Sequence, residues 1–209
     1  MFGIQNFEAF LAASIMLNLI PGPDTFYILG RSLSQGRMTG IASALGVSGG
    51  AVCHTLAAAI GLSALITASP TAFWMVKLLG AAYLVYLGVQ MIKHSKVAFH
   101  SVATGASRQF FSVFKQGVLT NALNPKVALF FLAFLPQFID ANTGSPFFSF
   151  IILGMTFVVT STVWGFCLAF LSSTISQKLR KNSKCLEYLN KMTGTLLIGL
   201  GIRLALDKS

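Results

Sequence analysis

The chain has 209 residues, of which 55% are hydrophobic and 10% are charged, and its mean hydropathy is +0.75. An ordinary soluble domain carries about 25% charged residues, so this composition excludes a protein whose main solvent is water. The net charge of +10 falls in short connections between apolar stretches, which is not the arrangement of a nucleic-acid-binding surface.

Six apolar stretches of helix length follow one another along the chain. A bilayer core of about 30 Å requires roughly 20 apolar residues per helix. The stretches cover residues 7–30, 41–67, 71–92, 111–138, 147–171 and 192–206. They predict an all-α integral membrane protein with six transmembrane helices, forming a single transmembrane domain over residues 1–209.

The first predicted span is interrupted near its end. Its sequence Pro21-Gly22-Pro23 cannot continue an α-helix, because proline lacks a backbone donor and its ring clashes with the preceding turn. Irregular backbone at membrane depth is tolerated only where protein or a water-filled cavity satisfies its polar groups. We therefore expect a helix break here that faces the protein interior, with Asn18 and Asp24 beside it.

The second predicted span carries small residues at helical spacing. Gly46 and Gly50 are four residues apart, and His54 follows at the same spacing. Small residues at this spacing let two helices approach closely, so both glycines are predicted close-packing positions. His54 shares their face, and because histidine is the side chain suited to gaining and losing a proton in the physiological range, it is a candidate for proton coupling. A hydrogen-bonded packing histidine is an equally good interpretation.

The fourth predicted span contains a second, milder break. Asn121 and Asn124 precede Pro125, and Lys126 follows it directly. Interrupted spans at corresponding places in two halves of a chain are a sequence indicator of a transporter's substrate site. The breaks at Pro21 to Pro23 and at Pro125 are therefore predicted to line such a site.

Landmarks of the first half recur in the second half in the same order. The pairs are Pro23-Asp24 with Pro125-Lys126, Gly50 and Gly61 with Gly154 and Gly165, and Lys77 to Gly80 with Lys191 to Gly194. Three spans per half is an odd number, so the second half must cross the membrane in the opposite sense. The series predicts two inverted repeats, about residues 1–95 and about residues 108–209, in which helices one and four are broken.

Two opposite charges are expected within the membrane, Asp24 and Lys126. A charge near the centre of a spanning helix costs about 2.5–3.5 kcal/mol on insertion scales. Our hypothesis is that Asp24 binds a substrate ammonium or a proton, and that Lys126 and the freed helix N-termini attract a carboxylate. Asn18, Asn121 and Asn124 are the candidate polar residues beside them. A permanent ion pair that only holds the halves together is the alternative.

The basic residues alternate between connections. Lysine and arginine occur in the first, third and fifth connections, whereas the second and fourth contain neither. The positive-inside rule therefore predicts that the basic loops are cytoplasmic and that both termini lie outside.

These motifs match a known family. Pro21-Gly22-Pro23-Asp24, the segment Gly46 to His54, and Asn124-Pro125-Lys126 resemble the lysine exporter and homoserine/threonine exporter family. The resemblance covers most of the chain. It implies a bacterial inner-membrane secondary transporter that exports amino acids or their derivatives by proton antiport, without ATP.

The paired charges favour a small neutral amino acid as the substrate, such as threonine, homoserine or a leucine-like amino acid. A lysine or arginine exporter is expected to supply a further anion. Export of basic amino acids and a passive channel for small zwitterions remain alternatives. The sequence contains no Ser/His/Asp triad pattern, no H-E-x-x-H motif and no cysteine pair, so we expect no enzyme activity, no metal and no cofactor. The oligomeric state, including a homo-oligomer, is left open.

Overall fold

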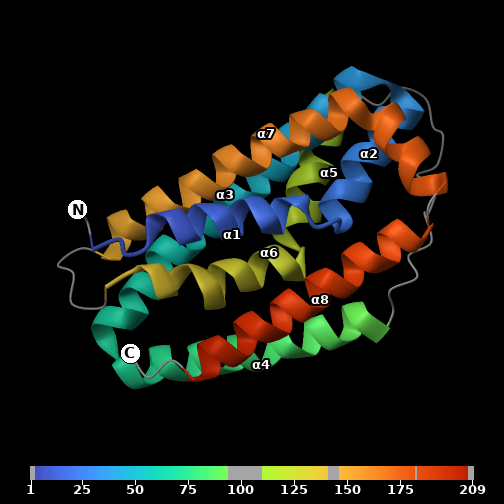
Figure 1. The fold of residues 1–209 in the computed structure, drawn as a ribbon. Coiled ribbons are helices and arrows are strands. Elements are labelled where there is room, and N and C mark those ends of the chain that lie inside the picture. Colours follow the sequence, from blue (N-terminus) through green and yellow to red (C-terminus); the bar gives the residue numbers. More distant parts are fainter. Residues whose placement is uncertain (1–2, 94–109, 141–145, 182, 207–209) are drawn as a thin grey trace.

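The computed structural model describes residues 3–93, 110–140, 146–181 and 183–206, and these are helical apart from short breaks (Figure 1). The elements in chain order are α1 (Phe7–Leu19), α2 (Pro23–Gln35), α3 (Arg37–Ala68), α4 (Pro70–Lys93), α5 (Phe110–Ala122), α6 (Pro125–Leu129), the π-helical turn η1 (Phe130–Phe134), the 3-10 turn η2 (Leu135–Phe138), α7 (Pro146–Lys181) and α8 (Ser183–Leu206). The expectation of an all-helical protein is confirmed.

Two of these helices are each long and apolar enough to cross a membrane, in α3 between Arg37 and Leu65 and in α7 between Pro146 and Ser172. The segments Phe110–Ala122 and Pro125–Phe138 meet the same requirement together, with a bend of 51° between them. Within the described residues the chain therefore has two spans, or three if the bent pair crosses as one. The predicted number of six crossings stays a prediction.

The helices extend beyond the apolar stretches that predicted them. Residues 172–191 were expected to form a polar connection, but α7 continues to Lys181 and α8 begins at Ser183. Serine, glutamine and lysine are acceptable helix residues in water, so a helix does not have to end where the hydrophobic pattern ends. At 36 residues, α7 is about 54 Å long and exceeds a bilayer core.

The interior of the bundle is built around α3, which packs between α5 and α7, and α1 and α2 lie against α7. The helices α4 and α8 run side by side along the lower edge of Figure 1. They are in close contact, because a Cβ on Gly88 or on Gly194 would lie 2.5 Å from the carbonyl oxygen of the other glycine. One residue, Gly36, separates α2 from α3, and its φ of 90° is a conformation that glycine adopts readily.

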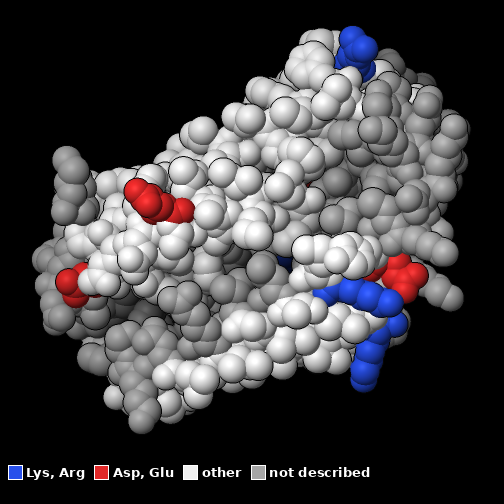
Figure 2. All heavy atoms as spheres, viewed as in Figure 1, with Lys and Arg blue, Asp and Glu red and all other residues white. Residues whose placement is uncertain are grey.

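Charged side chains are distributed unevenly along the bundle. Lysine and arginine gather at the right-hand end of Figure 2, where Figure 1 places the end of α2 and the adjoining ends of α4 and α8. Acidic atoms appear at the opposite end, near the start of α1 and the end of η2, and a further acidic patch lies beside the basic residues at the right-hand end, where Lys191 pairs with Glu187 on α8. We call the first of these the basic end of the bundle.

Candidate functional site

The two helix breaks meet at the start of α2. The side-chain amides of Asn121 and Asn124 both donate to Oδ2 of Asp24, each at 2.8 Å. Asp24 belongs to the first turn of α2, where the helix dipole favours a negative charge. The acid beside the first break is thus held by two polar residues from the second break, which lies about 100 residues further along the chain.

The other intramembrane charge, Lys126, is held by the first break. Its ammonium donates to the carbonyl oxygens of Leu17 at 3.1 Å and Ile20 at 3.0 Å. The Leu17 carbonyl has no intrahelical donor, because the residue four positions later is Pro21, which has no N–H. Lys126 therefore supplies a positive charge at the carboxyl end of α1, where the helix dipole also favours it.

Asp24 and Lys126 form no direct ion pair in the described part of the chain. Each is instead bonded to groups that the opposite break provides. The permanent ion pair that the sequence left as an alternative is thus absent from this conformation. Both charged groups remain on the wall of one cavity.

The second break has its own pattern of hydrogen bonds. Oδ1 of Asn124 accepts from the backbone N–H of Lys126 at 3.1 Å and so caps α6. The carbonyl oxygen of Asn121 lies 3.2 Å from Nε2 of His54. Because a carbonyl only accepts, Nε2 carries the hydrogen of this bond. His54 also stacks on Phe131, with ring centroids 5.6 Å apart, and it is not among the residues that line the cavity.

Gly46 and Gly50 lie where α3 approaches α5. A Cβ on Gly50 would be 2.6 Å from Cβ of Asn121, and one on Gly46 would be 3.0 Å from Cα of Gly117. The absence of side chains on α3 therefore makes room for α5 and for the asparagine that binds Asp24.

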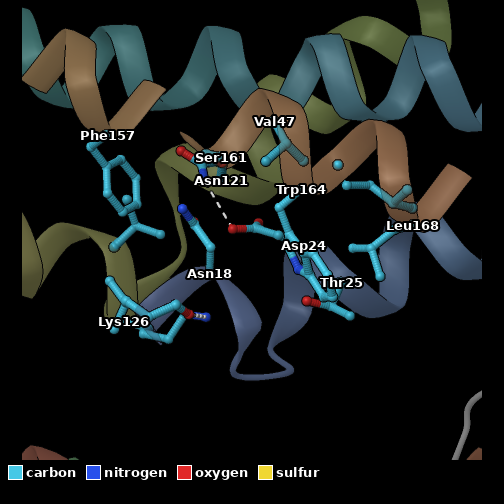
Figure 3. A pocket seen from close by; sticks show the side chains of 14 residues that line it. Asn18, Asp24, Thr25, Val47, Asn121, Lys126, Phe157, Ser161, Trp164 and Leu168 are labelled. Atoms are coloured by element: carbon cyan, nitrogen blue, oxygen red, sulfur yellow. Dashed lines mark hydrogen bonds between the residues drawn. The ribbon is translucent and has the colours of Figure 1, made fainter. Parts of the chain in front are cut away.

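A small cavity lies between the two breaks (Figure 3), and its volume of about 20 Å³ is room for a single water molecule. Asn18, Asp24, Asn121 and Lys126 line it, together with residues of α7. Three buried polar atoms of its wall have no hydrogen-bond partner among the described residues, namely Oδ1 of Asp24, Oδ1 of Asn121 and Nε1 of Trp164.

Asn18 forms part of the cavity wall that faces a second, larger hollow. Its side-chain amide donates to Oγ1 of Thr160 at 3.1 Å, which joins α1 to α7. On the other side of this contact lies an apolar hollow of about 300 Å³, lined by exposed residues such as Ile15 and Val163. Asn18 and Trp164 line both this hollow and the small cavity.

The predicted site residues thus fall into groups. Asn18, Asp24, Asn121 and Lys126 line the cavity, and Asn124 bonds to Asp24. His54, Gly46 and Gly50 support the second break from α3. The three prolines of the breaks, Pro21, Pro23 and Pro125, and also Gly22, do not line the cavity; they act through the backbone groups that they leave free.

Sequence reasoning placed none of its predicted site residues on α7. Phe157, Ser161, Trp164 and Leu168 line the cavity from one face of this helix. Their spacing of three and four residues is that of one helix face. The sequence indication of a cavity wall here was Trp164, one turn after Ser161 within an apolar helix. The same pattern also fits a helix face that only packs against its neighbours.

Two broken helices around a buried, charged cavity are typical of membrane transporters. The chain belongs to the LysE type translocator family, whose sequence profile matches residues 15–208. The resemblance noted from the motifs is therefore confirmed.

Curated relatives extend over nearly the whole chain. A leucine efflux protein of an Enterobacter species is 30% identical, covering 98% of this chain and 97% of its own length. A leucine efflux protein of Klebsiella pneumoniae is 29% identical over 98% of this chain and 96% of its own. An uncharacterized membrane protein of Bacillus subtilis is 34% identical over 98% of this chain and all of its own. No solved structure matches the chain.

Proposed function

We propose that this protein exports a neutral aliphatic amino acid, with leucine as the representative substrate, from a bacterial cytoplasm in exchange for protons. The observation that carries the proposal is the set of three buried polar atoms without partners around one cavity. Unpaired buried polar groups are costly, and they are expected where a ligand completes their hydrogen bonds. The relatives named leucine efflux protein support this class of substrate.

The three atoms fit the two charged ends of an amino acid. Oδ1 of Asp24 and Oδ1 of Asn121 are acceptors and suit an ammonium, whereas Nε1 of Trp164 is a donor and suits a carboxylate. The first N–H groups of α2 have no intrahelical acceptor and would assist the carboxylate. In this arrangement Lys126 contributes mainly by holding the end of α1, and its remaining N–H is left for the substrate.

The rest of the cavity wall indicates the side chain of the substrate. Ile28, Val47, Phe157 and Leu168 contribute apolar surface, and Asp24 is the one carboxylate among the described residues that line the cavity. One carboxylate balances one ammonium. A lysine or arginine substrate would bring a second positive charge into an apolar wall, which is unfavourable without a second anion.

The geometry of Asp24 supports coupling to protons. Its Oδ2 is occupied by two asparagine amides, so Oδ1 is the oxygen that remains for either a proton or a substrate ammonium. Because the two cannot occupy Oδ1 together, release of one accompanies binding of the other, and this is the basis of antiport. At a membrane potential of 100 mV one proton supplies about 2.3 kcal/mol, enough for a roughly fiftyfold gradient of a neutral solute.

Transport also requires that the cavity widen and open, because it now holds about one water molecule. Two apolar clusters close it. The smaller is toward the basic end and includes Ile28, Val47 and Leu168, and the larger includes Phe10, Phe130 and other residues of α1, η1, η2 and α7. Rocking of one half of the bundle against the other would open these clusters in turn.

The architecture supports two inverted repeats with six crossings. Each half has a broken first helix, and the close contact of Gly88 with Gly194 joins the third helices of the two halves. With the basic end in the cytoplasm, as the positive-inside rule requires, the termini lie outside. The described helices agree with an even number of crossings, since α1 begins and α8 ends at the same end of the bundle in Figure 1.

The experiment is leucine transport in vesicles reconstituted with the purified protein under an imposed proton gradient. The wild-type protein should move labelled leucine against its gradient. Asp24→Asn keeps the size of the side chain but removes the titratable charge, and it should lower uphill transport by more than about tenfold. Glu8→Gln changes an exposed acid at the start of α1 and is the matched control.

Three results would count against the proposal. Equal uphill transport by the Asp24 and Glu8 variants would remove the coupling role of Asp24. Equilibration of leucine without accumulation would indicate a passive channel. Equal transport of arginine and leucine would refute the substrate class.

A further inference from the structure

A second unpaired charge lies on α2, beyond the cavity. Arg31 is 5% exposed, although it is a cation. It follows Asp24 by seven residues, which places both on the same face of the helix at an axial separation of about 10 Å. The mechanism proposed above makes no use of this residue.

The partners of Arg31 are all uncharged. Nη1 donates to Oε1 of Gln35 at 3.1 Å, and Nη2 donates to Oε1 of Gln116 at 2.6 Å. The guanidinium lies 5.5 Å from the centre of the Tyr27 ring. Its Nε is buried without a hydrogen-bond partner, and no carboxylate of the described residues pairs with it.

This arrangement is incomplete without an anion. Burying a full charge is expensive unless it is paired, and amide oxygens offer only partial negative charge. The guanidinium presents several N–H groups in a planar fork that matches the two oxygens of a carboxylate. The free Nε identifies the edge of that fork at which a carboxylate would bind.

The position of Arg31 indicates when such a carboxylate would bind. Arg31 lies one turn beyond Ile28, a member of the smaller apolar cluster that closes the cavity. It therefore stands on the side of that cluster toward the basic end, whereas Asp24 stands on the cavity side. The ammonium and carboxylate of one α-amino acid are attached to the same carbon, so a single molecule cannot reach both sites at once.

We propose that Arg31 is a carboxylate-binding site for the transported amino acid at the basic end of the bundle, occupied before the substrate passes the Ile28 cluster to Asp24. This inference rests on the proposed function and adds to it a first binding position. It assigns recognition of the carboxylate to Arg31 during approach and to Trp164 within the cavity.

The transport test compares leucine with leucinamide, in which a neutral amide replaces the carboxylate. In oriented vesicles, Arg31→Gln should raise the half-saturating concentration of leucine by about tenfold or more when leucine is supplied at the basic end, with no such rise for leucinamide. Arg37→Gln, which removes an exposed arginine at the start of α3, is the control for surface charge. A rise for both substrates alike, or for neither, overturns the proposal.

A binding test keeps the inference separate from the transport mechanism. Isovalerate has the carboxylate and the branched chain of leucine but no ammonium, so it can complete the Arg31 site without Asp24. It should raise the melting temperature of the purified wild-type protein and leave that of Arg31→Gln unchanged. Arg31→Lys keeps the charge without the fork and should show a smaller rise than the wild type, which serves the test if Arg31→Gln does not fold.

The two proposals fail in different ways. Equal stabilisation of the wild-type protein and the Arg31 variant by isovalerate overturns the carboxylate site, whatever the transport assay shows. A wild-type protein that binds isovalerate through Arg31 but does not move leucine uphill overturns the proposed function instead.

Discussion

A methyl group at position 50 should disturb the site without changing any residue that touches the cavity. In Gly50→Ala the new Cβ would lie 2.6 Å from Cβ of Asn121 and 2.8 Å from the carbonyl oxygen of Val118. Ordinary contacts of this kind begin near 3.4 Å, so α5 must move away from α3 by about 0.6–0.8 Å. Part of the obstruction is backbone, so a side-chain rotation alone cannot relieve it.

The expected consequence is a weakened contact between Asn121 and Asp24. Their hydrogen bond is now 2.8 Å long, and a shift of this size would bring it to the limit of a useful bond. Hydrogen bonds to charged groups contribute about 1.5–3 kcal/mol, and overpacking of a tight contact costs about 1–3 kcal/mol. We expect the unfolding free energy in detergent to fall by about 2 kcal/mol and leucine transport to fall severalfold.

Gly61→Ala is the matched control, because Gly61 lies in the same helix and a Cβ there has no neighbour within 4 Å. Both substitutions gain the same helix propensity, about 1 kcal/mol, so this contribution cancels in the comparison. Thermal unfolding and transport of the two variants should be measured side by side. If Gly50→Ala behaves as Gly61→Ala does, the close approach of α3 and α5 is not what positions Asn121.

Three further substitutions test individual contacts of the site. Lys126→Met removes the donor from the two carbonyls at the end of α1 and should lower the unfolding free energy, measured by thermal unfolding, by about 2 kcal/mol or more. Lys93→Met, at an exposed position, is the control and should leave this free energy unchanged. His54→Gln keeps a hydrogen-bond donor and should retain most of the proton-coupled leucine transport, whereas His54→Leu removes the donor and should lose this transport. Loss of transport in both variants would indicate that the imidazole itself carries the coupled proton. Trp164→Phe removes the unpaired N–H and should raise the half-saturating leucine concentration about tenfold without changing the melting temperature. Trp74→Phe, at an exposed position, is its control. Unaltered leucine affinity of Trp164→Phe would exclude Nε1 from substrate binding.

The two breaks solve the same chemical problem with different residues. A proline leaves the carbonyl four residues before it without its helical donor. At the first break Lys126 supplies donors to α1. At the second break the Asn121 carbonyl accepts from the backbone N–H of Asn124 and from His54. Two of the conspicuous polar residues of the sequence thus have a structural task, and Asp24 is left as the charged group with an unpaired atom in the cavity.

Much of this could be predicted from the sequence because it depends on local rules. Proline chemistry alone determines that the chain breaks at Pro21 to Pro23 and before Pro125, and hydropathy determines that helices fill most of the described chain. The pairing of the two breaks was predicted from their matching places in the two halves, and the structure brings Asp24 next to Asn121 and Asn124. The family also follows from these motifs.

Only the tertiary structure decided which groups each charge contacts. The sequence suggested that Asp24 and Lys126 approach each other, but packing directs Lys126 to the carbonyls of α1 and Asp24 to two asparagines. Packing of the helices also brings Trp164 to the cavity and buries Arg31 among amide groups, although hydropathy placed this arginine in a polar connection. Hydropathy and motif spacing describe one segment at a time, whereas the partner of a buried polar atom depends on segments that meet only when the whole chain has folded.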